Sequence, residues 1–317
     1  MCLPRRAPWK VCLSEVTEPA RPPVDIEPGR TRPPGFAIDA RTARRRFERS
    51  ANSYAQASRL EAEIGVRMLE RLDYVKLAPR LVLDAGSGPA RDARALAKRY
   101  RKAEVLAVDF SQAMLHAGRP RLRFFQRRPP KPVCADLARL PLANATVGLV
   151  WSNMALHWAA DPVAALREFH RVLAVEGLLM FSTLGPDTLA ELRSAAGGAR
   201  VHAFADMHDL GDMLVAAGFA EPVMDMERIN MVYADGEALL ADLRASGQTC
   251  ALAGQIGEPR RGLAGRRFRA ALMEKLAAQR SAGGLSVSYE VVYGHAWKAA
   301  PRRTEDGRDI VQFQRLR

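Results

Sequence analysis

Three acidic residues stand at the ends of three short apolar runs in the first half of the chain. Asp84 ends "LVLD", Asp109 ends "EVLAVD", and Asp136 follows "PVCA". Gly86 and Gly88 come directly after the first of these acids, and their missing β-carbon permits a tight turn and a close backbone approach to a ligand. Carboxylates attract cations and accept hydrogen bonds from hydroxyl and amino groups. The pattern therefore predicts a binding site for a positively charged ligand rich in such groups.

The glycine turn could hold a dinucleotide, a phosphate or S-adenosylmethionine. A turn between a strand and a helix offers free backbone N–H groups and the positive end of a helix dipole. A dinucleotide fingerprint needs a third glycine at position 91, where this chain has Arg91, and a P-loop needs Gly-Lys-Ser/Thr, which does not follow. The three acids are spaced to meet an ammonium group, the hydroxyls of a ribose and the amino group of an adenine. S-adenosylmethionine carries these three groups and no phosphate, so the acids favour it as the ligand.

The three acids and the glycine turn can form one site only if the strands before them belong to the same sheet. Apolar runs alternate with helical periods, which predicts a parallel sheet with right-handed crossovers, helices on both faces and a ligand at the carboxyl ends of the strands. The strands are expected at 81–84, 104–109, 132–135, 147–152 and 177–183. The helices between them are expected at 90–100, 111–117, 162–173 and 186–195, after a helical stretch over 40–72.

The ends of the chain and its last third differ from this pattern. Residues 1–37 are rich in Pro and Arg without an apolar period, which predicts a disordered extension. We expect one domain over 38–298, with a helical insertion over about 236–280 between two late β-rich runs, 221–233 and 285–298. Residues 299–317 are interpreted as a basic tail.

Composition narrows the class of protein. In 317 residues, 48% of them hydrophobic, no run reaches the roughly 18 apolar residues of a membrane span. The four cysteines are scattered and form no C-x-x-C pair, which indicates neither a disulfide framework nor a zinc site. The N-terminus resembles neither a signal peptide nor a transit peptide. We therefore expect a cytoplasmic protein.

The net charge of +13 is concentrated in 118–132 and 259–270. Such segments are either solvated arginines or a surface for an acidic partner.

Four stretches, "LDAGSGPARDARAL", "AVDFSQAML", "ADLARLPL" and "VWSNMALHW", resemble successive motifs of class I S-adenosylmethionine-dependent methyltransferases. The resemblance implies a Rossmann-like α/β fold with a seven-stranded, mostly parallel sheet and an antiparallel final strand. It also implies S-adenosylmethionine as cofactor, with no metal. One departure is Ala90, which stands at the third glycine of the family motif. The cofactor-binding residues that it implies are Asp84, Gly86, Gly88, Asp109, Met114, Asp136, Leu137 and Asn153.

A finer resemblance is to the malonyl-acyl-carrier-protein O-methyltransferases of biotin synthesis. It is carried by "FERSANSYAQASRLEAEIG", "SNMALHWAADPVAALREFHRVL", "FSTLGPDTLAELR" and "VSYEVVYGHAW". It implies methylation of the free carboxylate of a malonyl thioester on an acidic acyl carrier protein, the partner for the basic segments. Within this reading Tyr54 closes over the cofactor and Arg167 pairs with the malonyl carboxylate, because a guanidinium fits a carboxylate bidentately. His157 and Trp158 are expected to shape the pocket.

Other functions stay open at this point. A related family of assembly factors for respiratory complex I shares the fold and the "HW" block and is associated with hydroxylation. A methyltransferase with another small-molecule acceptor and a non-catalytic binding protein are further alternatives. Nucleic acid is the weaker interpretation of the basic charge, because the fourth strand is followed by "WSNMALHW" and not by the N/D-P-P-Y motif of base amino methyltransferases.

Overall fold

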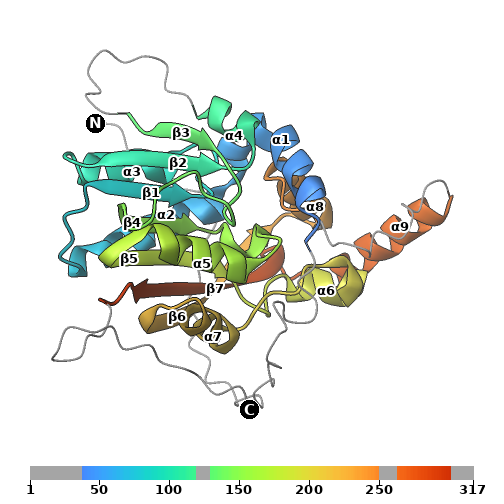
Figure 1. The fold of residues 1–317 in the computed structure, drawn as a ribbon. Helices are drawn as coiled ribbons and strands as arrows, with labels where there is room; N and C mark the ends of the chain where they lie inside the picture. The colour runs from blue at the N-terminus through green and yellow to red at the C-terminus, as the bar shows by residue number, and fades with distance from the viewer. Residues whose placement is uncertain (1–37, 119–128, 250–262, 301–317) are drawn as a thin grey trace, which may run out of the picture.

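A seven-stranded sheet forms the centre of the protein (Figure 1). The computed structural model describes residues 38–118, 129–249 and 263–300. Within them the strand order is β3-β2-β1-β4-β5-β7-β6. The strands are β1 (Leu81–Ala85), β2 (Glu104–Asp109), β3 (Lys131–Cys134), β4 (Val147–Asn153), β5 (Leu173–Leu184), β6 (Ala220–Tyr233) and β7 (Leu285–Trp297).

The sheet is parallel except at one side. β3, β2, β1, β4 and β5 run in the same direction, whereas β7 pairs antiparallel with both β5 and β6. This arrangement confirms the predicted Rossmann-like fold with an antiparallel final strand. Because β1, β2 and β4 are parallel neighbours, their carboxyl ends meet at one edge of the sheet, where a ligand is expected.

Both faces of the sheet are covered, which explains the continuous apolar runs of the central strands. In β1, Val82 belongs to one core cluster and the next residue, Leu83, to the other. The first face packs against α2 (Arg59–Arg71) and α3 (Arg91–Arg99). The second packs against α5 (Pro162–Val172) and α7 (Met207–Ala216).

The stretch expected to be helical over 40–72 consists of two helices. α1 (Ala40–Ala57) ends at Ser58, and α2 follows at once. Arg91 holds this break, since its guanidinium donates to the carbonyls of Ser58 and Ala55, both at 3.0 Å. The Ser58 carbonyl also accepts the first backbone hydrogen bond of α2, from the N–H of Ala62 at 3.2 Å, whereas the carbonyl of Ala55 lies in the last turn of α1, where carbonyls lack partners within the helix. Arg91 therefore links the end of one helix to the start of the next. Contacts between α1 and α4 (Gln112–Ala117) complete this side of the fold.

Three further helices lie near β7. They are α6 (Ala190–Ala196), α8 (Gly236–Ala245) and α9 (Leu263–Ala278), and α9 contacts both others before extending away from the body (Figure 1). α8 and α9 fall in the stretch expected as a helical insertion. Within the described ranges, no helix combines the length and the apolar character that crossing a membrane requires.

Candidate functional site

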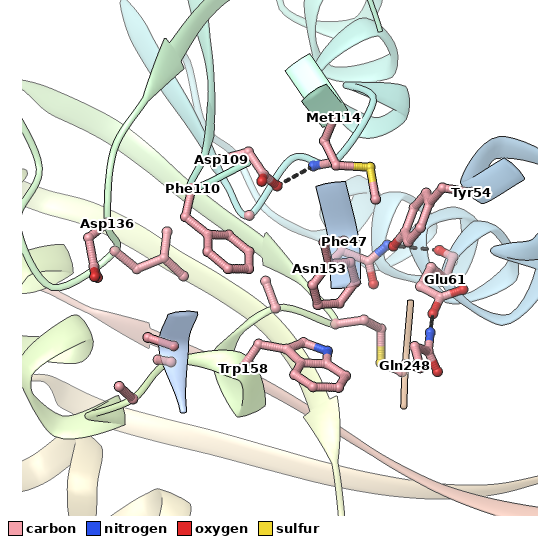
Figure 2. A pocket seen from close by; sticks show the side chains of 18 residues that line it. Phe47, Tyr54, Glu61, Asp109, Phe110, Met114, Asp136, Asn153, Trp158 and Gln248 are labelled. Carbon is pink, nitrogen blue, oxygen red and sulfur yellow. Dashed lines mark hydrogen bonds between the residues drawn. The ribbon is translucent and has the colours of Figure 1, made fainter. Parts of the chain in front are cut away.

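A pocket opens at the carboxyl ends of β1, β2 and β4. Its volume is about 750 Å³, part of which is open to solvent, within the range of ligand sites. Figure 2 shows Asp136 and Phe110 at one end and Glu61 and Gln248 at the other. Eight of the ten residues predicted from the sequence line it: Tyr54, Gly86, Gly88, Asp109, Met114, Asp136, Leu137 and Asn153.

The end of β2 and the glycine turn are joined through Asp109. Its Oδ2 accepts a hydrogen bond from the backbone N–H of Gly88 at 2.8 Å, and its Oδ1 accepts one from the N–H of Ser111 at 2.8 Å. Burial raises the pKa of Asp109 to about 6, while these two hydrogen bonds act in the opposite direction. The carboxylate is thus ionised at neutral pH and fixed in place. Each oxygen keeps a lone pair for a ligand hydroxyl.

The turn after β1 has room for glycine alone at its tightest point. Gly86 has a φ of +81°, and a β-carbon there would lie 2.2 Å from the Cβ of Ala155. Gly88 has a φ of +52°. Both conformations are open to glycine at little cost, and they bring the backbone directly against the pocket.

The end of the pocket near β3 combines a carboxylate with apolar contacts. Asp136 is exposed, and its Oδ1 accepts a hydrogen bond from the N–H of Ala138 at 2.9 Å. Leu137 and Phe110 line the same pocket, and the buried Met114 faces it from α4. Apolar side chains beside one carboxylate acceptor suit an adenine base, whose amino group is a donor.

At the opposite side, Asn153 joins β4 to α2 and α3. Its Nδ2 donates to the carbonyl oxygen of Glu61 and to Oδ2 of Asp92, both at 2.8 Å, and its Oδ1 accepts from Ser182 Oγ at 2.8 Å. The amide therefore has partners on both its nitrogen and its oxygen, which fixes its orientation. This network makes Asn153 a positioning group as well as a wall of the pocket.

Asp84 is not among the residues that line the pocket. It is buried, and its Oδ2 has no hydrogen-bond partner among the described residues. Burial and the nearby carboxylate of Asp92 raise the pKa of Asp84 well above its usual value. A buried polar atom without a partner is unusual, and it marks a place where a donor from a ligand or from water would be stabilised. The predicted contact of Asp84 with an ammonium group stays a prediction.

Glu61, on α2, is a pocket residue that the sequence analysis did not identify. Its Oε1 accepts a hydrogen bond from the Nε2 of Gln248, a residue 187 positions later in the chain. Burial raises the pKa of Glu61 to about 7. The signal was present locally, since Glu61 shares a helix face with the apolar Ile64 and Met68, three and seven residues on. A carboxylate on a buried helix face indicates a functional or paired group.

An aromatic wall closes the pocket between its two ends. Phe47, on α1, meets Trp158 with ring centroids 5.0 Å apart and Tyr54 at 6.3 Å, both edge to face. Gly88 lies under the Tyr54 ring, because a β-carbon there would be 3.4 Å from Cε1 of Tyr54. Tyr54 and Trp158 both line the pocket, and the closing of Tyr54 over the cofactor stays a prediction.

Two other predicted residues lie outside this pocket. Arg167 is exposed on α5, while its neighbours Leu166 and Phe169 are buried against the sheet. Its predicted pairing with an acceptor carboxylate thus receives no support from its position. His157 is buried behind the wall, where its Nδ1 lies 3.2 Å from Oγ1 of Thr183. Burial lowers the pKa of His157 to about 3, so it is neutral at pH 7.

Several predictions fall on parts of the chain outside the described residues. They are the disordered extension over 1–37, most of the basic tail over 299–317, and much of the basic segments 118–132 and 259–270. Arg266, Arg267 and Arg269 are described, and they are exposed on α9. Within the described ranges, no group of three or more His, Cys, Asp or Glu is placed to hold a metal ion.

Two curated proteins of the same name are similar to this chain over most of its length. The malonyl-[acyl-carrier protein] O-methyltransferase of Gallionella capsiferriformans is 47% identical over 285 residues, which cover 87% of this chain and 97% of that protein. The protein of the same name from Laribacter hongkongensis is 48% identical over 291 residues, covering 88% and 97%. The family described as "Methyltransferase domain" matches residues 83–181, which run from β1 into β5.

Among solved structures, the YcgJ protein of Bacillus subtilis has a similar fold. It aligns with a TM-score of 0.53 at 16% identity, over 75% of this chain and 98% of that protein. At this identity the likeness concerns the fold alone.

Proposed function

Because this chain belongs to the family of malonyl-[acyl-carrier protein] O-methyltransferases, we propose that it methylates the free carboxylate of a malonyl thioester held by an acyl carrier protein. The methyl donor is S-adenosylmethionine. The observation that carries the proposal is the identity of 47–48% to proteins of that name across 96–97% of their length. In biotin synthesis, such an ester masks a charge that fatty-acid enzymes would reject.

The pocket residues fit this donor. The glycine turn brings the backbone against the pocket, and the carboxylates of Asp109 and Glu61 line it, which suits a ligand that carries hydroxyl groups and a positive charge. We assign Asp109 to the ribose hydroxyls, Asp136 to the adenine amino group and Met114 to the adenine face. Glu61 is assigned to the methionine end, where an ammonium group must be neutralised. When bound, S-adenosylmethionine supplies an electrophilic methyl group on a sulfonium.

The protein's own residues orient the reactants and exclude water. A carboxylate is already a nucleophile at pH 7, so its methylation needs no general base, and the neutral, buried His157 agrees with that requirement. In an in-line displacement the rate depends on alignment and on removal of solvent. Phe47, Tyr54 and Trp158 form the wall that would provide both.

Transfer of a labelled methyl group tests this proposal. With methyl-labelled S-adenosylmethionine, malonyl-carrier protein should become labelled, and mild base should release the label as methanol because a methyl ester has formed. Acetyl-carrier protein is the matched control, since it lacks the free carboxylate, and should stay unlabelled. Tight cofactor binding without transfer to malonyl-carrier protein would contradict the proposal, and transfer to a free small acid instead would assign another acceptor.

A further inference from the structure

A second pocket adjoins the cofactor site, and we propose that it receives the phosphopantetheine arm of the carrier protein, with the phosphate held by Arg200 and Arg244. We call it the arm pocket. It has a volume of about 990 Å³, part of it open to solvent. This inference rests on the proposed function, because it names where the acceptor of that reaction lies.

The arm pocket meets the cofactor pocket at two shared residues. Trp158 and Gln248 line both. Trp158 also contacts His202 on the far side, with ring centroids 4.9 Å apart. A ligand that enters the arm pocket and reaches Trp158 therefore arrives next to the methyl donor.

The walls come from α6, α8 and α9. α6 contributes Leu192, α8 contributes Leu243, and α9 contributes Phe268 and Leu272. Figure 1 shows α6 and α9 side by side at this corner of the molecule, in agreement with their contacts. Such a wall is suited to the uncharged, partly aliphatic stretch of a pantetheine arm.

The charged groups of the arm pocket are of one sign. Arg200 and Arg244 line it, and among its described lining residues there is no Asp or Glu. The Arg200 guanidinium stacks 4.2 Å above the centroid of the Phe268 ring, which fixes its position. Burial lowers the pKa of His202 to about 4, so this histidine adds no charge at neutral pH.

The location of the arginines indicates which anionic group they bind. Both are exposed, so they belong to the open side, whereas Trp158 and Gln248 mark the side that reaches the methyl donor. The attacking carboxylate must lie at that inner side. The remaining anion of a carrier-bound malonyl group is the phosphate that joins the arm to the protein, and arginine binds phosphate with paired, charge-assisted hydrogen bonds.

The test compares two small acceptors that differ in this phosphate alone. Malonyl-pantetheine and malonyl-4′-phosphopantetheine are assayed with the wild-type protein, with Arg200→Gln/Arg244→Gln and with each single variant. We expect the double variant to lower kcat/KM for the phosphorylated acceptor by about tenfold or more, as expected for loss of a charged hydrogen bond. The kcat/KM for malonyl-pantetheine and the affinity for S-adenosylmethionine should stay near those of the wild type.

Arg101→Gln is the matched control. Arg101 is exposed and precedes β2, at the edge of the sheet opposite the pocket. Its substitution should therefore leave kcat/KM unchanged for both acceptors. Equal losses on both acceptors, or no loss on either, would overturn the inference. The proposed function fails only if the wild-type protein does not methylate malonyl-carrier protein. If it methylates neither small acceptor, binding decides the inference: phosphopantetheine must bind more tightly than pantetheine, and the double variant must remove that preference.

Discussion

The carboxylate of Asp109 and the backbone N–H of Gly88 form a hydrogen bond of 2.8 Å between the ends of two adjacent parallel strands. The bond ties the acid after β2 to the glycine turn after β1. The groups that we assign to the cofactor on these two strands are thus held in a fixed relation to each other. Such preorganisation reduces the cost of ordering the site on binding.

Loss of the Asp109 carboxylate should weaken cofactor binding. Asp109→Ala leaves two ribose hydroxyls without their charged acceptor and removes the link to Gly88, so we expect an affinity lower by about tenfold or more. Asp109→Asn keeps the size of the side chain and one acceptor oxygen, so its affinity for the cofactor should lie between those of the wild type and Asp109→Ala. Calorimetric titration with S-adenosylmethionine measures this, and wild-type affinity in Asp109→Ala would remove this residue from the site.

Cofactor binding should depend on pH through Glu61. Burial raises the pKa of Glu61 from 4.5 to about 7, so the folded chain holds a proton that the unfolded chain loses at lower pH. The contribution of Glu61 to stability therefore falls as pH rises from about 4.5 to about 7. Affinity for a cationic ligand should change the opposite way, rising by up to about tenfold per pH unit below the pKa, because the ionised form alone attracts an ammonium group.

Glu61→Gln is the variant that isolates this effect. It keeps the shape and one acceptor of the side chain but removes its titration. Calorimetry at pH values on either side of 7 should show a flatter pH dependence than in the wild type, and an unchanged profile would show that Glu61 does not face the cofactor's charge.

The sequence predicted the strand ends well and the long-range parts of the site poorly. Asp84, Asp109 and Asp136 follow apolar runs, so their approach at one sheet edge follows from local patterns and parallel pairing. The contact of Glu61 with Gln248 joins residues 187 positions apart, and no local period encodes it.

Arg167 shows a second limit. Its residue type suits a carboxylate, but a helix can turn such a residue to solvent, and the buried neighbours Leu166 and Phe169 decide that it does. Side-chain direction on a helix follows from packing against the sheet, which residue type alone does not determine.

Ala90 should be a strained position. It has a φ of +57° at the start of α3, where the family motif has glycine. An L-residue in the left-handed region costs about 1 kcal/mol. We expect Ala90→Gly to raise the free energy of unfolding by a similar amount in urea titrations, with little change in cofactor affinity because Ala90 is not among the residues that line the pocket. A lower stability would show that the local packing of the methyl group outweighs the strain.

Charge reversal on α9 should slow methylation of malonyl-carrier protein but not of a small acceptor. Arg266 and Arg267 are exposed on the helix that contributes Phe268 to the arm pocket. Attraction between a basic helix and an acidic carrier mainly raises the association rate, so Arg266→Glu/Arg267→Glu should lower kcat/KM for malonyl-carrier protein by about tenfold at low salt. Malonyl-4′-phosphopantetheine and the control variant Arg101→Glu should behave as wild type. Equal loss with the small acceptor would refute docking on α9.

A crystal structure with S-adenosylhomocysteine tests most directly whether the ends of β1, β2 and β4 hold the methyl donor. We expect the ribose hydroxyls on Asp109, the adenine between Met114 and Asp136, and the sulfur directed toward Trp158. A nucleoside bound elsewhere, or one turned so that its ribose does not reach Asp109, would contradict this placement of the methyl donor.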